Sequence, residues 1–136
     1  MNIYVYNELE QKTELMFVEN EEIEGNEIFA DDSIRKVWHS GLEEWYLSIY
    51  DVVKVLTDSN DPKQYIKKMR ARDKELDSKW GTICTPLQMF APDGKMRKAQ
   101  AANIEGILRV IQSIKSPKAE PFKVWWQKLE QNDLMK

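Results

Sequence analysis

The beginning of the chain alternates between apolar and polar positions, as a short strand does. Ile3 to Asn7 reads IYVYN and alternates at the period of two that a half-buried strand requires. LMFV, residues 15–18, indicates a second strand. The stretch ENEEIEGNE, residues 19–27, is acidic, contains Gly25 and has no apolar period. It is typical of a loop or a mobile link.

Two short apolar runs then flank Gly41. Residues 33–48 read SIRKVWHSGLEEWYLS, with Val37 and Trp38 before the glycine and Trp45 and Leu47 after it. Two runs of this length that are joined by a few polar residues predict a β-hairpin.

The pattern next changes to a helical period. Ile49, Val52, Val53 and Leu56 are spaced i, i+3, i+4, i+7, which predicts a short helix with one buried face. Ser48 precedes this run, and Asp51 lies three residues after Ser48. This is a capping-box-like start, with an acid near the positive end of the helix.

A second helix is predicted after the break TDSND, residues 57–61. Asp61 can cap it, and Pro62 occupies the first helical position, where a missing N–H costs nothing. Two short helices joined by a tight turn are the parts of a helix-turn-helix. The second of them is the place of a recognition helix.

That second helix carries a basic stripe. Residues 61–74 read DPKQYIKKMRARDK, with six basic and two acidic residues. At about 100° per residue, Lys63, Lys67, Arg70 and Lys74 fall on one face, and Tyr65, Ile66, Met69 and Leu76 fall on the other. Like charges one turn apart repel by a few tenths of a kcal/mol per pair, so local helix stability does not explain the stripe. A polyanionic partner explains it, and so does an ordinary lysine-rich surface.

A strand, a turn and a second strand are predicted over residues 83–103, after a loop at DSKWGTI, residues 77–83. Pro92, Asp93 and Gly94 form a strong turn signal. Pro86 suggests that the first strand is an edge strand or is bulged. The basic residues Lys95, Arg97 and Lys98 lie at or just past the turn. A basic hairpin after a helix-turn-helix is the order of a winged helix.

Two further helices are predicted in the last part of the chain. Asn103 can cap the first, whose apolar stripe runs from Ile104 to Ile114, and Gly106 within it suggests close packing. SPKAEP, residues 116–121, breaks the chain. The last helix carries Phe122, Trp125, Trp126 and Leu129, a spacing that favours core packing or a partner surface over base stacking.

These elements predict an α+β fold, a small winged-helix-like domain with β-hairpins and about four helices. Residues 29–136 form this domain, and residues 1–28 form an acidic N-terminal segment. The 136 residues suit one domain with a real core.

The charge is unevenly divided. Residues 1–33 contain ten acids and one lysine, a net charge of −9, whereas residues 34–136 contain nineteen basic and thirteen acidic residues, a net charge of +6. Together they give the −3 of the whole chain. A basic domain is a reason to consider nucleic acid, and the acidic segment is either regulatory or merely solubilising.

Catalysis and metal binding find little support. His39 is the only histidine and Cys84 the only cysteine, and both are expected to be structural. Asp51, Asp58 and Asp61 could supply a metal-dependent nuclease, but Asp51 and Asp61 are explained as helix caps. No nucleotide-binding glycine pattern is present. The protein is therefore expected not to be an enzyme and to have no cofactor and no metal.

Location follows from what the sequence lacks. A single cysteine suits a reducing compartment. No apolar run approaches the ~18 residues of a membrane span, and no secretory signal is evident. A cytoplasmic protein without a membrane partner is expected.

Three stretches resemble one known family. They are IRKVWH…EEWYLSIYDVVKVLTDSNDPKQYI, APDGKMRKAQAANIEGILRVIQSI and SPKAEPFKVWW, and they span about Phe29 to Leu129. They are similar to the BRO-type N-terminal domain of phage and prophage antirepressors, related bacterial proteins and insect large DNA viruses. The resemblance implies a DNA-binding domain, often joined to a variable C-terminal domain. It supplies no catalytic residue, and the segment before Phe29 has no counterpart in it.

The first functional hypothesis is a DNA-binding, antirepressor-like regulator of transcription with double-stranded DNA as partner. Its expected DNA-binding residues are Lys63, Gln64, Lys67, Arg70, Lys74, Lys95, Arg97 and Lys98. Base recognition is expected mainly from Arg70, or from Gln64. The alternative is a module that captures a phage repressor protein through the acidic segment or the C-terminal aromatic helix. The target sequence and the oligomeric state do not follow from the sequence.

Overall fold

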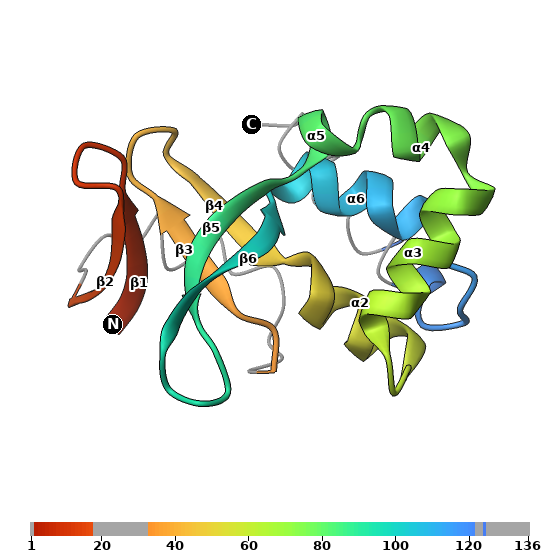
Figure 1. Ribbon diagram of the computed structural model, residues 1–136, viewed down its shortest axis with the longest axis horizontal. Coiled ribbons are helices and arrows are strands. Elements are labelled where there is room, and N and C mark those ends of the chain that lie inside the picture. The colour runs from red at the N-terminus through yellow and green to blue at the C-terminus, as the bar shows by residue number, and fades with distance from the viewer. Residues whose placement is uncertain (1, 18–32, 122–123, 125–136) are drawn as a thin grey trace.

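The computed structural model of the protein describes residues 2–17, 33–121 and 124. The fold is α+β, with a six-stranded sheet beside a group of helices (Figure 1). The strands are β1 (Asn2–Asn7), β2 (Lys12–Phe17), β3 (Lys36–His39), β4 (Glu44–Ser48), β5 (Thr85–Phe90) and β6 (Met96–Ala102). The described helices are α2 (Ile49–Thr57), α3 (Pro62–Arg72), α4 (Lys74–Ser78), α5 (Trp80–Ile83) and α6 (Ile104–Gln112).

The strands form one curled sheet in the order β2-β1-β3-β4-β6-β5. Neighbours are antiparallel except β1 and β3, which are parallel with Val5 opposite Trp38. The curl brings the outermost strands, β2 and β5, close together. The Thr13 N–H of β2 donates to Gln88 Oε1 of β5 at 3.2 Å. Pro86 lies in β5, which is an edge strand as expected.

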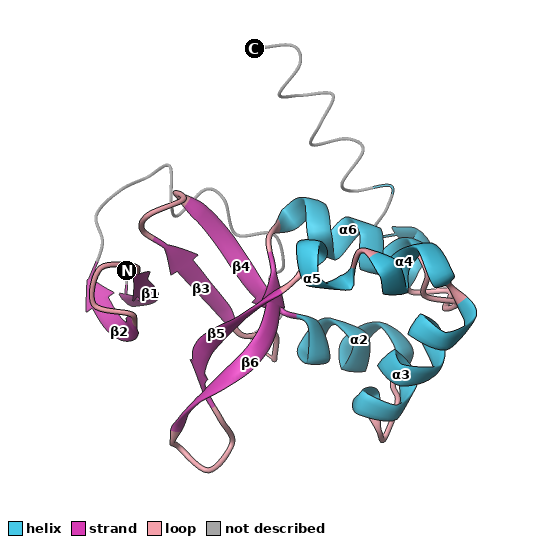
Figure 2. Cartoon of the chain, turned by 45° about the horizontal axis from the view of Figure 1, so that its top comes forward, coloured by secondary structure: helices cyan, strands magenta, loops and turns pink. Residues whose placement is uncertain are grey.

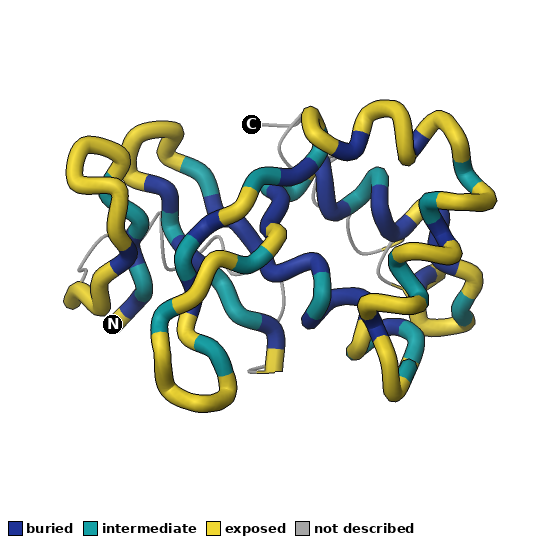
Figure 3. The backbone as a smooth tube through the Cα atoms, in the orientation of Figure 1, coloured by how far each residue is buried: buried dark blue, intermediate teal, exposed yellow. Residues whose placement is uncertain are grey.

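The core has two parts, one on each face of the sheet. Alternation along β1 sends Ile3 and Val5 to the helix side and Tyr4 and Tyr6 to the other side. The helix-side part is the larger, and it joins strand residues such as Leu47 to the buried faces of α2 and α6. Figure 3 shows these helices largely buried, whereas the outer part of α3 and the tip of the β5–β6 hairpin are exposed.

The helix pair has the boundaries that its caps predict. Ser48 Oγ accepts from the Asp51 N–H at 3.2 Å, and Asp61 Oδ1 accepts from the Gln64 N–H at 3.1 Å. Pro62 is the first residue of α3. One expectation was incomplete, because the Asp51 carboxylate does not complete a capping box. It pairs with Arg35, and the Ser48 N–H donates to the Arg35 carbonyl instead.

The prediction of a loop over residues 77–83 is wrong, because these residues belong largely to α4 and α5. Asp73 leaves the helical conformation after α3, and its side chain caps α4 by accepting from the Leu76 N–H at 3.0 Å. Burial of Leu76 and Trp80 then holds α4 and α5 against the core. The helices therefore exceed the expected four within the described residues alone.

Helix α6 confirms the close packing expected at Gly106. Asn103 caps it by accepting from the Gly106 N–H at 2.9 Å. A Cβ on Gly106 would lie 2.6 Å from the Ile83 carbonyl oxygen and 2.9 Å from Ala102 Cβ. The predicted last helix, with Phe122, Trp125, Trp126 and Leu129, lies outside the described residues.

Two further features bear on the expected organisation. Residues 2–17 of the acidic segment form β1 and β2, so that segment contributes strands and core residues to the sheet. The β5–β6 hairpin is continuous with the sheet, because β6 pairs with β4. Across residues 2–17, 33–121 and 124, no helix combines the length and apolar character needed to cross a membrane.

Candidate nucleic-acid interface

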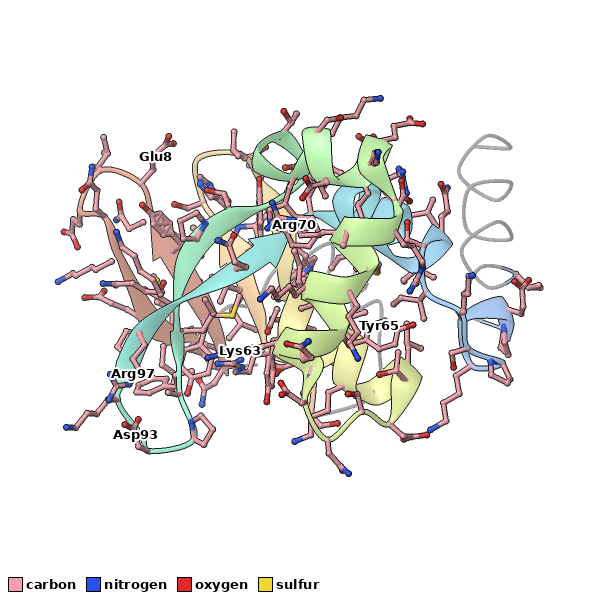
Figure 4. The ribbon with its side chains drawn as sticks, turned by 45° about the vertical axis from the view of Figure 1, so that its right-hand side comes forward. Glu8, Lys63, Tyr65, Arg70, Asp93 and Arg97 are labelled. Carbon is pink, nitrogen blue, oxygen red and sulfur yellow. The ribbon has the colours of Figure 1, made fainter. Side chains whose placement is uncertain are left out.

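An open groove of about 1130 Å³ lies between the β5–β6 hairpin and the helices α2 and α3. Figure 2 shows the β5–β6 hairpin starting where the sheet meets the helices, with its turn directed away from β3 and β4. Figure 4 shows Lys63 on the side of α3 that faces the hairpin carrying Asp93 and Arg97, with Tyr65 on the opposite side. The groove is therefore built from the helix pair and the hairpin that the sequence singled out.

The lining of this groove is strongly cationic. Its basic residues are Arg35, Lys54, Lys63, Arg70, Arg97, Lys98 and Lys118, and its acidic residues are Asp51 and Asp58. Both acids already have cationic partners, because Asp51 pairs with Arg35 at 2.7 Å and Asp58 pairs with Lys118 at 2.8 Å. Of the other five cations, Arg70 and Arg97 pair with Asp77 and Asp93 outside the lining. Lys54, Lys63 and Lys98, which have no acidic partner among the described residues, are left to interact with an anionic ligand.

Two of the expected residues on α3, Lys63 and Arg70, line the groove. Lys63 is exposed and has no acidic partner among the described residues. Arg70 is held in place, because its Nε donates to Asp77 Oδ1 at 2.7 Å and its guanidinium carbon lies 4.8 Å from the centre of the Trp80 ring. This ion pair and cation–π contact leave the terminal nitrogens of Arg70 available as donors. They also restrict the conformations that the side chain can adopt.

The other expected residues of the stripe lie outside this groove. Lys67 lines a smaller hollow of about 390 Å³, next to Lys63 and Arg70. Lys74 belongs to α4, because Asp73 interrupts the helix between it and Arg70. Gln64 is exposed on α3 but lines neither hollow. The prediction that all four stripe residues lie on one continuous helix is thus wrong for Lys74.

The hairpin contributes from the opposite wall. Lys98 and Gln100 share a face of β6 with Ala102, which packs in the helix-side core, so they face the helices. Arg97 also lines the groove, and its Nη2 donates to Asp93 Oδ2 at 2.7 Å. That hydrogen bond is the main reason why the pKa of Asp93 lies below its ordinary value.

Lys95 stands at the hairpin turn, outside the residues that line the groove. Its backbone N–H donates to Asp93 Oδ1 at 3.0 Å, and Gly94 supplies the positive φ of 81° that the turn requires. The side chain of Lys95 is exposed, so it extends the cationic surface beyond the end of the groove.

Sequence reasoning missed three of the groove cations. Lys54 lies on the polar face of the predicted helix that contains Asp51, and that placement was a usable signal. Arg35 and Lys118 reach the groove through contacts with residues far away in the sequence, and their spacing gave no signal. Of these three, Arg35 and Lys118 pair with Asp51 and Asp58, so Lys54 is the one that adds an unpaired cation among the described residues.

Asp73 attaches the end of α3 to α6. It accepts from the Ser113 hydroxyl and the Leu76 N–H, and it pairs with Arg109 at 3.2 Å. The Ser113 hydrogen bond is the largest cause that lowers the pKa of Asp73 to about 2. Arg72 donates to the Ser113 carbonyl at 2.7 Å, so two adjacent residues hold α3 against the C-terminal end of α6.

His39 and Cys84 have structural environments. His39 is buried between Tyr6 and Tyr46, and its Nδ1 accepts from the Leu42 N–H at 3.0 Å. Cys84 is buried, and burial raises the pKa of its thiol to about 11. Within the part of the chain that the structure describes, no group of three or more His, Cys, Asp or Glu residues could hold a metal ion.

Comparison with known proteins gives one match. Residues 33–131 match the family model described as the BRO family, N-terminal domain. No curated protein and no solved structure matches the chain. The matched range begins after β2 and contains the helix pair, the hairpin and every residue that lines the groove.

Proposed function

Because this chain belongs to the BRO family, whose N-terminal domain its residues 33–131 match, we propose that it is a DNA-binding, prophage antirepressor-like regulator of transcription. Membership supports nucleic-acid binding in general. The proposal adds a surface, a mechanism and double-stranded DNA as the partner.

One observation carries the proposal, namely the cationic groove between α3 and the β5–β6 hairpin. DNA presents phosphates at regular intervals along each strand, and cations that neutralise them release counterions. Two cationic walls that face each other suit one sugar–phosphate strand lying between them. Lys63 from α3 and Lys98 from β6 supply one exposed cation to each wall, and neither has an acidic partner among the described residues.

In the proposed complex the chain uses a winged-helix-like arrangement. Helices α2 and α3 act as the helix-turn-helix, and the β5–β6 hairpin acts as the wing. The exposed face of α3, with Gln64 and Lys67, approaches the base edges, while the groove holds the adjacent backbone. Arg70, held by Asp77 and Trp80, contacts phosphate in this arrangement, and base reading passes to Gln64.

The test is a titration of labelled duplex DNA by fluorescence anisotropy at several salt concentrations. The variant pair Lys63→Ala and Lys98→Ala removes one cation from each wall. The double variant is expected to bind more weakly, with a salt slope smaller by about 2, because each lost phosphate contact lowers the slope by about 1.

Lys68→Ala is the matched control, because Lys68 is exposed on the same helix but lines neither hollow. It is expected to leave affinity and salt slope close to those of the unmodified chain. A double variant that bound DNA like this control would remove the groove from the proposal. No binding of the unmodified chain at ~50 mM salt would reject DNA binding itself.

Capture of a phage repressor is the second candidate, and the exposed apolar side chains of β2 favour it. Leu15, Met16 and Phe17 are 56%, 47% and 64% exposed on an edge strand within the acidic segment. Apolar side chains on an open strand edge can form a contact surface for a protein. This candidate predicts that the chain displaces a repressor from its operator, and that Leu15→Ser with Phe17→Ser abolishes this effect while DNA binding stays unchanged.

A further inference from the structure

Arg35 joins three elements that surround the groove. Its backbone N–H and its Nε donate to Asp51 Oδ2 at 2.9 and 2.7 Å, and its Nη2 donates to Asp51 Oδ1 at 3.1 Å and to Ser48 Oγ at 3.2 Å. Its Nη1 donates to the Phe90 carbonyl at 3.0 Å. One side chain thus connects the start of α2 to the last residue of β5.

The hairpin needs such a connection because little of it is paired with the rest of the sheet. Strand β6 pairs with β4 only at Ala101 and Ala102, near the base of the hairpin. The outer half pairs with itself, from Gln88 opposite Lys98 to Phe90 opposite Met96. Two groups contact this half from the other end of the sheet. The Thr13 N–H donates a hydrogen bond to Gln88 Oε1, and the centre of the Tyr4 ring lies 5.2 Å from that of Phe90. Arg35 approaches it from the helix side.

The Arg35 side chain is itself rigidly held. The Asp51 side chain is 9% exposed and accepts from Arg35 through both carboxylate oxygens, in the paired geometry that a guanidinium permits and an ammonium does not. Asp51 belongs to α2, which packs against α3. A displacement of the hairpin relative to the helix pair would break the hydrogen bond from Arg35 to Phe90.

We infer that Arg35 is a positioning residue, which sets the distance between the hairpin and the α2–α3 pair and so the width of the DNA-binding groove. This inference rests on the proposed function. Arg35 acts through Phe90 and Asp51, and its guanidinium does not contact DNA.

If Arg35 instead contacted a phosphate directly, the change in DNA affinity on substitution of Asp51 would have the opposite sign. Replacing Asp51 by Asn would release Arg35 toward a phosphate and tighten DNA binding if Arg35 touched DNA. If Arg35 positions the hairpin, Asp51→Asn loosens the connection and weakens binding. Arg35→Lys separates the same alternatives, because it keeps the charge that a phosphate contact needs and loses the paired geometry.

The first experiment is the same DNA titration with the full chain carrying Arg35→Lys or Asp51→Asn. Each variant is expected to bind about tenfold more weakly, the factor that loss of a hydrogen bond to a charged group can produce. The salt slope is expected to stay unchanged, because no phosphate contact is removed. Wild-type affinity for Arg35→Lys, or tighter binding for Asp51→Asn, would overturn the inference. Should Asp51→Asn not fold, Arg35→Lys decides alone.

A second experiment measures the position of the hairpin without DNA. Spin labels at Lys95→Cys and Lys68→Cys report the distance between the hairpin turn and α3, and the native Cys84 is buried and does not compete for the label. Arg35→Lys is expected to broaden the distance distribution. An unchanged distribution would reject the positioning role. This measurement stays decisive even if the unmodified chain fails to bind DNA and the proposed function falls.

Discussion

At the scale of the residue, the charges at the groove are organised by acids that hold cations in place. Asp77 holds Arg70, Asp93 holds Arg97 and Asp51 holds Arg35, all with N–O distances of 2.7 Å. The exposed pairs at Arg70 and Arg97 contribute little to stability. Their effect is on geometry, because a long side chain that is held before binding loses less freedom when a phosphate arrives. Lys54, Lys63 and Lys98 have no such partner among the described residues and provide the adaptable contacts.

Asp73 gives the residue-scale prediction. Its pKa is lowered to about 2 from an ordinary 3.8, so its ionised form stabilises the fold fully above pH 3.8. That contribution is lost as the pH falls from 3.8 through 2, because the carboxyl is then protonated in the folded state as well. Asp73→Asn is expected to lower the free energy of unfolding at neutral pH, and the difference from the unmodified chain is expected to shrink across this window.

Urea unfolding followed by tryptophan fluorescence at a series of pH values measures this difference. Asp93→Asn is a suitable control, because Asp93 also has a lowered pKa but lies at the exposed hairpin turn. A difference for Asp73→Asn that stayed constant from neutral pH to pH 2 would show that the Ser113 and Arg109 contacts do not carry the effect.

At the scale of the element, the packing of α6 leads to a prediction at Gly106. An alanine would normally favour a helix by about 1 kcal/mol relative to glycine. At Gly106 the new Cβ would lie 2.6 Å from the Ile83 carbonyl oxygen, which belongs to the backbone and cannot easily move. Gly106→Ala is therefore expected to destabilise the protein by about 1–3 kcal/mol, as overpacking of a core does.

Gly81 offers the matched comparison, because it lies in α5 and a Cβ there would meet nothing within 4 Å. Gly81→Ala is expected to leave stability unchanged or to raise it by up to about 1 kcal/mol. Thermal unfolding of both variants checks the pair. If the two alanines had the same effect, close approach of α6 to Ile83 would not be the reason for glycine at position 106.

The predictability of each element depended on how local its causes are. Caps, turns and apolar periods involve neighbours in the sequence, and they gave α2, α3, α6 and the β3–β4 and β5–β6 hairpins. The break at Asp73 was missed because the charge period of the basic stripe continues through it. The cap of α4, in which Asp73 accepts from the Leu76 N–H, is local, whereas the contact of Asp73 with Ser113 joins residues far apart in the sequence. The groove was half predicted, since Lys63, Arg97 and Lys98 follow local patterns and Arg35 depends on Asp51 and Phe90.

At the scale of the whole molecule, the fold places strands from the acidic segment in the same sheet as the basic hairpin. The parallel pairing of β1 with β3 and the contact of β2 with β5 join residues 2–17 to the rest of the fold. No local pattern specifies these pairings, because they depend on which long-range contacts bury Ile3 and Val5. Deleting the acidic segment would therefore remove part of the core, so it cannot serve as a test of charge alone.

Neutralising charge without shortening the chain tests whether the acidic segment opposes DNA binding. Substituting Gln for Glu19, Glu21, Glu22, Glu24 and Glu27 keeps the length and removes five negative charges. If the segment competes with DNA for the basic surface, the variant is expected to bind duplex DNA more tightly at low salt. The advantage is expected to fade as salt increases, because the Debye length falls from about 10 Å at 0.1 M to about 3 Å at 1 M.

Anisotropy titrations of the variant and the unmodified chain over this salt range measure the effect. The same substitutions combined with Lys63→Ala and Lys98→Ala locate it, because competition for the groove requires the groove cations. In that combined variant the gain at low salt is expected to be smaller. Equal gains with and without the two lysines would mean that the acidic segment repels DNA through its overall charge. Identical affinities of the variant and the unmodified chain at every salt concentration would show that these acidic residues do not control DNA binding. The role of the segment would then be structural, through β1 and β2.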